Sequence, residues 1–334
     1  MNILVTGAAG FLGAKITRRL LADGHDVAGV DIMHPQDWWR LLAHKRLTYT
    51  WTHLEDITLK RGYDAVVHCA ASSNVGFVQN SPKYAMHQTV LGTLQLLRQC
   101  VEQSVSKVFI NISSHSVYGA PQYTPVDEVH PRVPNNVYGA LKVAQEALVD
   151  SFREHYGLNT ITLRMATMFG EQDRRGSTVY EILLKIMRGE TITITGDGEQ
   201  TRDFNYVGNA CDAIVLALTA QPNGYVYNVG SGRALSINDL VHTLARETGP
   251  SVPIIKYVPA RPGEEKMKDF SLVIDEARMS LGYAPIVDFE EGVRRLYQWV
   301  RDQLSHTSSP LSRMSEELLP TSSASQSSDL ASHT

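Results

Sequence analysis

A tyrosine and a lysine, Tyr138 and Lys142, are four positions apart in the run Tyr-Gly-Ala-Leu-Lys. On a helix this spacing places both side chains on one face, a single turn apart. A tyrosine is a poor base at neutral pH, because its ordinary pKa is about 10. Bringing that pKa into the neutral range takes roughly 4 kcal/mol of preferential stabilisation of the phenolate. The lysine ammonium and a second nearby cation would supply it, so the pair predicts proton transfer to and from a hydroxyl group.

The serine-rich run Ser113-Ser114-His115-Ser116 directly follows the apolar segment 107–112 (KVFINI), which is typical of a buried strand. In doubly wound folds, ligands bind at the carboxyl ends of the parallel strands. A serine at that place would hydrogen-bond the reacting oxygen. The alternative for the serine run is that its serines only cap a helix, and the alternative for Tyr138 is a buried tyrosine on a core helix. Each motif taken alone fits its alternative. The interpretation therefore depends on a third motif near the start of the chain.

That third motif is a glycine-rich turn of the form GxxGxxG, between a short apolar run (2–6) and a helical pattern (11–22). Glycines let the backbone approach a pyrophosphate closely, and the helix that follows offers free N–H groups and the positive end of its dipole. A strand, this turn and a helix are the context that a dinucleotide site requires. We expect the contacts to come from Gly7, Gly10, Phe11, Leu12 and Gly13.

Two further segments indicate which dinucleotide is bound. Asp31 ends the second expected strand (25–30), where a carboxylate accepts both hydroxyls of an adenosine ribose and repels a 2′-phosphate. The sequence therefore predicts NAD and not NADP. Asp56 and Ile57 follow a possible third strand, where we expect a contact with the adenine ring.

Strand and helix patterns alternate through the first half of the chain, which predicts an α/β fold with a doubly wound parallel sheet. We expect residues 1–170 to form the dinucleotide-binding domain, with 203–232 returning to it. Residues 171–202 and 233–303 are expected to form a smaller C-terminal substrate-binding lobe. The serine-rich segment 304–334 has no aromatic residue and is expected to be a disordered tail.

Composition excludes several functional classes. The chain has 334 residues and a formal net charge of −4, so no strongly basic surface is available for nucleic acid. No apolar run is long enough to span a membrane. Three widely spaced cysteines predict neither a disulfide framework nor a metal site, and with no recognisable signal segment they favour the cytoplasm.

The chain resembles the extended short-chain dehydrogenase/reductase family, in its NAD-dependent nucleotide-sugar epimerase and dehydratase branch. The resemblance covers about residues 1–303. Its motifs are GxxGxxG at 7–13, HCAA at 68–71, SSHSVYG at 113–119, YGALK at 138–142, GDGEQTRDFNYV at 196–207, YNVGSG at 227–232 and RPGE at 261–264.

The resemblance implies a Rossmann-type domain and a catalytic triad of Ser114, Tyr138 and Lys142. Tyr138 and Lys142 would also contact the cofactor. Arg202 and Arg261 would bind a diphosphate, which suits the forked guanidinium group. It further implies a homodimer through the helices near 89–103 and 137–155.

Three positions depart from the family pattern. The usual asparagines are replaced by threonines at Thr89 and Thr167, and the usual aspartate of the YVxD motif is Asn209. Because Thr167 stands at a substrate-contacting position, an unusual sugar or a non-nucleotide substrate stays open. His115 replaces the acidic residue that family dehydratases carry after their catalytic serine or threonine. It is interpreted as a substrate-side residue with a structural hydrogen bond, or else as an additional acid or base.

The sequence thus predicts an NAD-dependent epimerase of a nucleotide sugar, acting at C4 through a transient 4-keto sugar. The alternatives are a 4,6-dehydratase and a sugar dehydrogenase or ketoreductase. A protein that only binds dinucleotide is the alternative from another class, and the intact Ser114, Tyr138 and Lys142 argue against it.

Overall fold

The computed structural model describes residues 1–34, 43–60, 62–105, 107–173, 176–220, 224–249, 253–260 and 270–305. Its centre is a seven-stranded sheet in the order β11-β6-β5-β4-β1-β2-β3, and every neighbouring pair is parallel. The strands are β1 (Asn2–Thr6), β2 (Asp26–Asp31), β3 (Leu47–Trp51), β4 (Ala65–His68), β5 (Val108–Ser114), β6 (Thr160–Met165) and β11 (Val226–Val229). The predicted doubly wound parallel sheet is confirmed.

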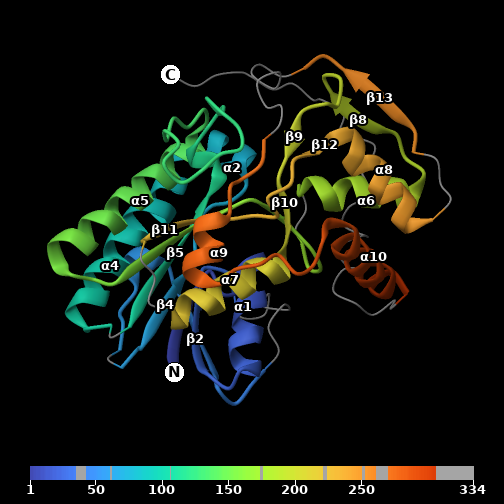
Figure 1. Cartoon of the computed structure of the whole chain (residues 1–334). Coiled ribbons are helices and arrows are strands. Elements are labelled where there is room, and N and C mark those ends of the chain that lie inside the picture. The colour runs from blue at the N-terminus through green and yellow to red at the C-terminus, as the bar shows by residue number, and fades with distance from the viewer. Residues whose placement is uncertain are drawn as a thin grey trace, which may run out of the picture.

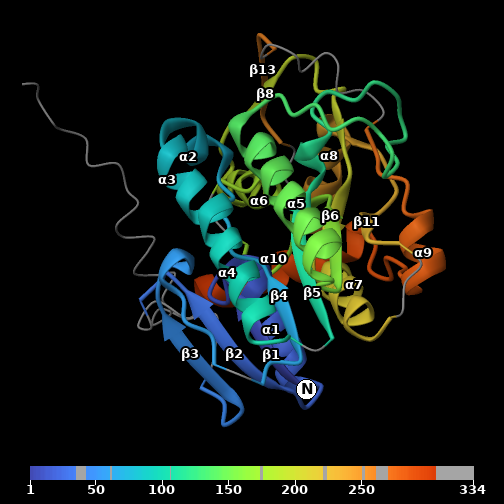
Figure 2. The same ribbon diagram turned by 90° about the vertical axis from the view of Figure 1, so that its left-hand side faces the viewer.

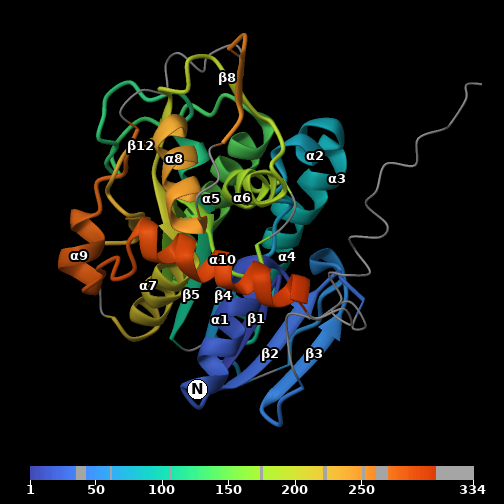
Figure 3. The same ribbon diagram turned by 90° about the vertical axis from the view of Figure 1, so that its right-hand side faces the viewer.

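Helices cover both faces of the sheet, because the central strands are apolar on both sides and must be shielded from water. Helices α4 (Gly92–Glu102) and α5 (Val137–Tyr156) lie over one face, together with α2 (Val75–Asn80) and α3 (Pro82–Met86), as Figure 2 shows. Helices α1 (Phe11–Ala22) and α7 (Val207–Thr219) lie over the other face (Figure 3).

The segment from Pro82 to Glu102 is not one regular helix. Helix α3 ends at Met86, a π-helical stretch covers His87–Leu91, and α4 begins at Gly92. At the start of α4 the backbone runs close to a neighbouring turn, since a Cβ built on Gly92 would lie 2.7 Å from Cβ of Leu54. π-Helical turns of this kind are often found at functional sites.

A smaller lobe lies beyond the carboxyl ends of the strands (Figure 1). Within the described residues, three two-stranded pairs and three helices lie in it. They are β7 (Thr167–Phe169) with β10 (Phe204–Tyr206), β9 (Thr201–Arg202) with β12 (Leu235–Ser236), β8 (Ile192–Thr195) with β13 (Ile255–Val258), and α6 (Thr178–Arg188), α8 (Ile237–Thr248) and α10 (Phe289–Ser305).

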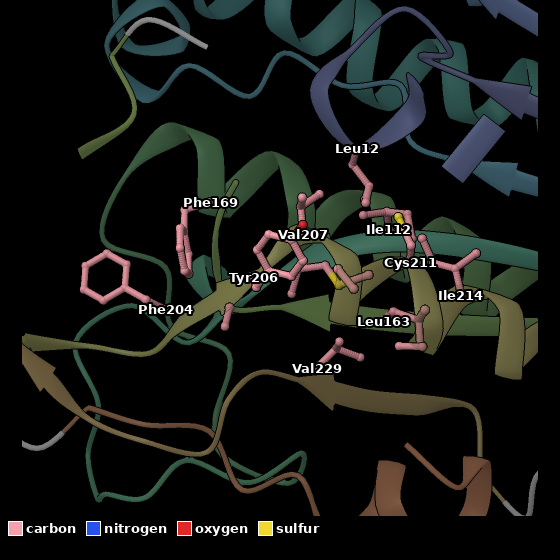
Figure 4. Packing of buried hydrophobic residues seen from close by; sticks show 14 of the residues in the cluster. Leu12, Ile112, Leu163, Phe169, Phe204, Tyr206, Val207, Cys211, Ile214 and Val229 are labelled. Carbon is pink, nitrogen blue, oxygen red and sulfur yellow. The ribbon is translucent and has the colours of Figure 1, made fainter. Parts of the chain in front are cut away.

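One apolar core runs from the sheet into this lobe. Figure 4 shows side chains of α1, β5, β6 and α7 packed together, with Phe169 and Phe204 continuing toward the lobe. Leu163 is fully buried in this core. The short helix α9 (Asp275–Leu281) packs against β11 and α7, on the side of the sheet. The division into two domains stays a prediction, and the proposed tail beyond Ser305 lies outside the described residues.

Candidate active site

A cleft of about 690 Å³ opens at the carboxyl edge of the sheet. Of the residues predicted to contact the cofactor or substrate or to act in catalysis, eleven line it. They are Gly7, Gly10, Phe11, Leu12, Gly13, Asp31, Ser114, His115, Tyr138, Lys142 and Thr167. The cleft thus brings together side chains that are far apart in the sequence, because parallel strands end at one edge.

The glycine-rich turn is built for close backbone approach. Gly7 has φ of +67°, and a Cβ at this position would lie 2.8 Å from the backbone nitrogen of Ala70. A Cβ at Gly13 would lie 1.9 Å from the carbonyl oxygen of Gly7. Gly10 is the N-cap of α1 and provides no side-chain cap, so the first-turn N–H groups of the helix face the cleft. Such a helix N-terminus fits a pyrophosphate.

Asp31 ends β2 beside this turn, and its side chain is nearly buried. One carboxylate oxygen accepts a hydrogen bond from the backbone N–H of Ala9 at 2.9 Å, and the other accepts from Met33 at 2.9 Å. Burial raises the pKa of the Asp31 carboxyl, against the effect of these hydrogen bonds. A carboxylate offers about four acceptor positions, so ribose hydroxyls can still bind it.

The predicted adenine contacts are not found in the lining of the cleft. Asp56 is exposed at the end of a short 3₁₀ turn (Leu54–Asp56), and Ile57 is 3% exposed within the apolar core. Thr52 and Leu54 line the cleft instead. Leu54 and Ile57 are both 3% exposed and pack in the same buried cluster, but of the two only Leu54 also lines the cleft.

Ser114 and Tyr138 lie on two elements that pack closely. Ser114 ends β5, and its hydroxyl oxygen accepts a hydrogen bond from the N–H of Ser116 at 3.2 Å. Asn136 caps α5 by accepting from the N–H of Gly139 at 2.9 Å, which places Tyr138 in the first turn of the helix. A Cβ at Gly139 would lie 2.4 Å from the carbonyl oxygen of Ser116. The glycine therefore allows α5 to approach the strand end that carries Ser114.

Lys142 lies one turn further along α5 and is 3% exposed. Its Nζ donates to the carbonyl oxygen of Ile112 and to Oε1 of Gln145, both at 2.8 Å. Burial lowers the pKa of Lys142 to about 8, with Cys69 and Glu146 acting in the opposite direction. Lys142 and Tyr138 both line the cleft, and their joint role in proton transfer stays a prediction.

His115 and Thr167 both line the cleft, directly after β5 and at the start of β7. Nε2 of His115 and Oγ1 of Thr167 are 3.3 Å apart and share a hydrogen bond. The imidazole ring lies tilted against the ring of Phe270, with 5.2 Å between the ring centroids. Burial, and then the positive charge of Arg202, lower the pKa of His115 to about 4. At neutral pH the imidazole is therefore uncharged. This fits its interpretation as a hydrogen-bonding residue better than a role as a protonated acid.

Of the two arginines predicted to bind the diphosphate, only Arg202 lies within the described residues. Arg202 is half-buried on β9 and donates to the carbonyl oxygen of Thr201 at 2.7 Å. It does not line the cleft, although its charge acts on His115. Arg261 lies outside the described residues.

Comparisons with known proteins decide the family. The model of the NAD dependent epimerase/dehydratase family matches residues 3–230, which is more than half of the chain. The chain belongs to this family. It is 30% identical to the UDP-glucose 4-epimerase of Mycolicibacterium smegmatis over 315 residues, which are 91% of this chain and 99% of that protein.

Two further similar proteins catalyse different reactions on nucleotide sugars. The chain is 28% identical to the dTDP-glucose 4,6-dehydratase of Streptomyces niveus over 318 residues, covering 90% of this chain and 93% of that protein. The solved UDP-glucose 4-epimerase of Thermotoga maritima, with UDP-glucose, superposes with a TM-score of 0.82 at 31% identity. That match covers 91% of this chain and 100% of the other.

The cofactor of this NAD-dependent family member is NAD, and the cleft fits it. The uncapped N-terminus of α1 suits the pyrophosphate, and Asp31 suits the adenosine ribose. Sequence reasoning missed several lining residues on the segments after β4 and before α6, namely Cys69, Ser72, Ser73, Phe77, Tyr84, Gln88, Asp173 and Ser177. The HCAA motif was the available signal for the first of these segments.

The described residues contain no group of three or more histidine, cysteine, aspartate or glutamate side chains that is arranged to hold a metal ion. No helix in these segments has the length and apolar character needed to cross a membrane.

Proposed function

We propose that the chain epimerises a UDP-sugar at C4, with Ser114, Tyr138 and Lys142 as the catalytic residues. The observation that carries the proposal is the convergence of these three residues and the glycine-rich turn in one cleft. The epimerases among the relatives, from Mycolicibacterium smegmatis and Thermotoga maritima, support the choice of reaction and of nucleotide.

Each residue has a chemical task in this proposal. Tyr138 takes the proton from the 4-hydroxyl of the sugar and later returns it. Ser114 holds the reacting oxygen, and the Lys142 ammonium favours the phenolate form of Tyr138. NAD, when bound, supplies reversible hydride acceptance at C4. The product keeps the mass of the substrate because the 4-keto sugar turns over and is reduced on its other face.

The other end of the substrate would be held from the lobe. His115 and Thr167 would face the sugar as uncharged hydrogen-bonding groups. Arg202 and Arg261 would bind the diphosphate, for which Arg202 must turn toward the cleft when substrate is present. The family also includes 4,6-dehydratases, so elimination of water is the second candidate. It is disfavoured because His115 and Ser116 follow Ser114, and the low pKa of His115 leaves no protonated acid there at neutral pH.

Product analysis with a panel of UDP-sugars and dTDP-sugars tests the proposal. We expect a product of unchanged mass with inverted configuration at C4, and no net formation of NADH. Tyr138→Phe should lower turnover by about 10²–10⁴-fold and leave NAD affinity nearly unchanged. A product lighter by one water would instead identify a dehydratase, and stoichiometric NADH would identify a dehydrogenase.

We also propose that the chain acts as a homodimer in the cytoplasm. Helices α4 and α5 lie side by side on one face, and they carry three partly exposed leucines, Leu94, Leu141 and Leu148. All three cysteines, Cys69, Cys100 and Cys211, are free thiols, as a reducing compartment allows. Analytical ultracentrifugation would test the dimer, and a monomer at micromolar concentration would contradict it.

A further inference from the structure

A buried chain of hydrogen bonds runs from the Lys142 ammonium into the interior of the protein. It passes through Gln145 on α5, Thr93 on α4 and His68 on β4, and ends at Thr6 on β1. Gln145, Thr93, His68 and Thr6 are all 0% exposed. Polar side chains this deeply buried are costly unless their hydrogen bonds are satisfied.

The donors and acceptors in this chain have one consistent direction. The Thr93 hydroxyl donates its only proton to the backbone carbonyl of Thr89, because a carbonyl oxygen can only accept. Its oxygen must then accept from its two other partners, Nε2 of His68 at 2.8 Å and Nε2 of Gln145 at 3.2 Å. Nδ1 of His68 in turn accepts from the Thr6 hydroxyl at 2.7 Å.

This direction fixes the amide of Gln145. Since its NH₂ group donates to Thr93, its oxygen is turned toward Lys142, where it accepts from Nζ at 2.8 Å. The ammonium has three N–H groups. Within the described residues, Ile112 and Gln145 accept two of them, and the third is available toward the cleft that Lys142 lines.

We infer that Gln145 is a positioning residue for Lys142, and that Thr93 and His68 hold its amide in the orientation that keeps this lysine charged and aimed into the cleft. The expected effect on turnover rests on the proposed function. The expected effect on the protonation of Lys142 rests on the contacts alone. An apolar residue at position 145 would leave a buried cation with one protein acceptor fewer, which disfavours the charged form. A neutral lysine no longer stabilises the Tyr138 phenolate.

Other groups around Lys142 do not replace this acceptor. Glu146 on α5 is engaged by Arg164 at 2.8 Å and by Ser113. His68, the last residue of β4, is fully buried, and Cys69 directly after it is partly buried. Burial raises the pKa of the Cys69 thiol and lowers that of the His68 imidazole to about 3. Tyr138, one turn earlier on α5, lines the cleft beside Lys142.

The test compares Gln145→Met with Gln99→Met. Methionine has a similar length and shape and no hydrogen-bonding amide. Gln99 is the matched control, because it is a buried glutamine on α4 whose amide bonds the backbone of Ile57 and Leu59, away from Lys142. In NAD-loaded protein with ¹³Cε-labelled lysine, NMR follows the titration of Lys142, and Lys142→Met assigns its signal.

We expect Lys142 in Gln145→Met to titrate about one pH unit or more below the wild type, and in Gln99→Met to titrate with the wild type. Turnover in Gln145→Met should fall roughly 10- to 100-fold, with the decrease in kcat and not in KM. A titration of Lys142 that is the same in Gln145→Met and the wild type would overturn the inference, whatever happens to the melting temperature.

Thr93→Val provides a second variant that leaves both Lys142 and Gln145 in place. It removes the oxygen that orients the amide, so Lys142 should titrate below the wild type by less than in Gln145→Met. No change in this variant would refute the orienting role of Thr93. If the wild-type protein converts no nucleotide sugar, the proposed function fails, while the lysine titration still decides whether Gln145 positions Lys142.

Discussion

Acidification from pH 7 to pH 5 is expected to destabilise the folded chain through His68. This imidazole is fully buried between the Thr6 and Thr93 hydroxyls, and burial, followed by the charge of Lys142, lowers its pKa to about 3. In the unfolded chain a histidine has a pKa of about 6.5. Below pH 6.5 the unfolded state binds a proton at this histidine, whereas the folded state binds one only near pH 3. The contribution of His68 to the unfolding free energy is therefore fully present above about pH 6.5 and is lost as the pH falls toward about 3.

The magnitude follows from the width of this window. Each pH unit between the two pKa values costs about 1.4 kcal/mol, so the step from pH 7 to pH 5 removes roughly 2 kcal/mol of unfolding free energy through His68 alone. His68→Gln carries no titrating group at this position. It should be less stable than the wild type at pH 7, yet lose about 2 kcal/mol less on going to pH 5.

Urea unfolding at the two pH values measures both proteins, with equal m-values as the check that the unfolded states are comparable. Titrating groups outside the hydrogen-bond chain of His68, including His115, are present in both proteins and cancel in the difference. If the wild type and His68→Gln lose the same free energy between pH 7 and pH 5, then His68 is not held neutral and the proposed direction of its hydrogen bonds is wrong.

Three further outcomes are expected. Gly13→Ala should weaken NAD binding by at least tenfold in calorimetry and lower the melting temperature, because its Cβ would lie 1.9 Å from the carbonyl oxygen of Gly7; unchanged affinity would contradict the packing of the turn. Asp31→Ser should weaken NAD binding and reduce the preference for NAD over NADP, and an unaltered ratio of the two dissociation constants would count against Asp31 as the ribose ligand. Arg164→Met should cost roughly 3 kcal/mol in denaturant unfolding, because it removes the buried guanidinium that binds both oxygens of Glu146 and leaves that carboxylate with Ser113 and the more exposed Arg132; a loss below about 1 kcal/mol would show that Arg132 alone compensates the Glu146 charge.

Much of the fold and of the active site could be predicted because both depend on short, regular patterns. Alternating strands and helices force a parallel sheet, and the carboxyl ends of its strands lie at one edge. The glycine-rich turn, Ser114 and the pair Tyr138 and Lys142 each stand at such an end or on the helix beside it. For these residues, the spacing in the sequence and the topology of the sheet together determine that they lie at its carboxyl edge.

The remaining features depend on packing between distant segments. Gln145 is an ordinary residue for a helix, and only the structure reveals its contact with Thr93, fifty-two positions earlier. Asp56 and Ile57 were predicted to contact the adenine, but a single tight turn moves them out of the lining and brings in Leu54. The pattern of apolar residues in the sequence does not predict which side chains of a tight turn line a cleft.

Because the chain is synthesised from its N-terminus, β6 lacks one of its two neighbouring strands for part of translation. β6 pairs with β5 on one side and with β11 on the other, and β11 follows only after the segment 166–225 has been made. A nascent chain that ends before Val226 therefore presents β6 as an open sheet edge with Ile161 and Leu163 on it. Such an edge is a template for pairing with other chains, so the interval before β11 emerges from the ribosome is when this protein depends most on chaperones.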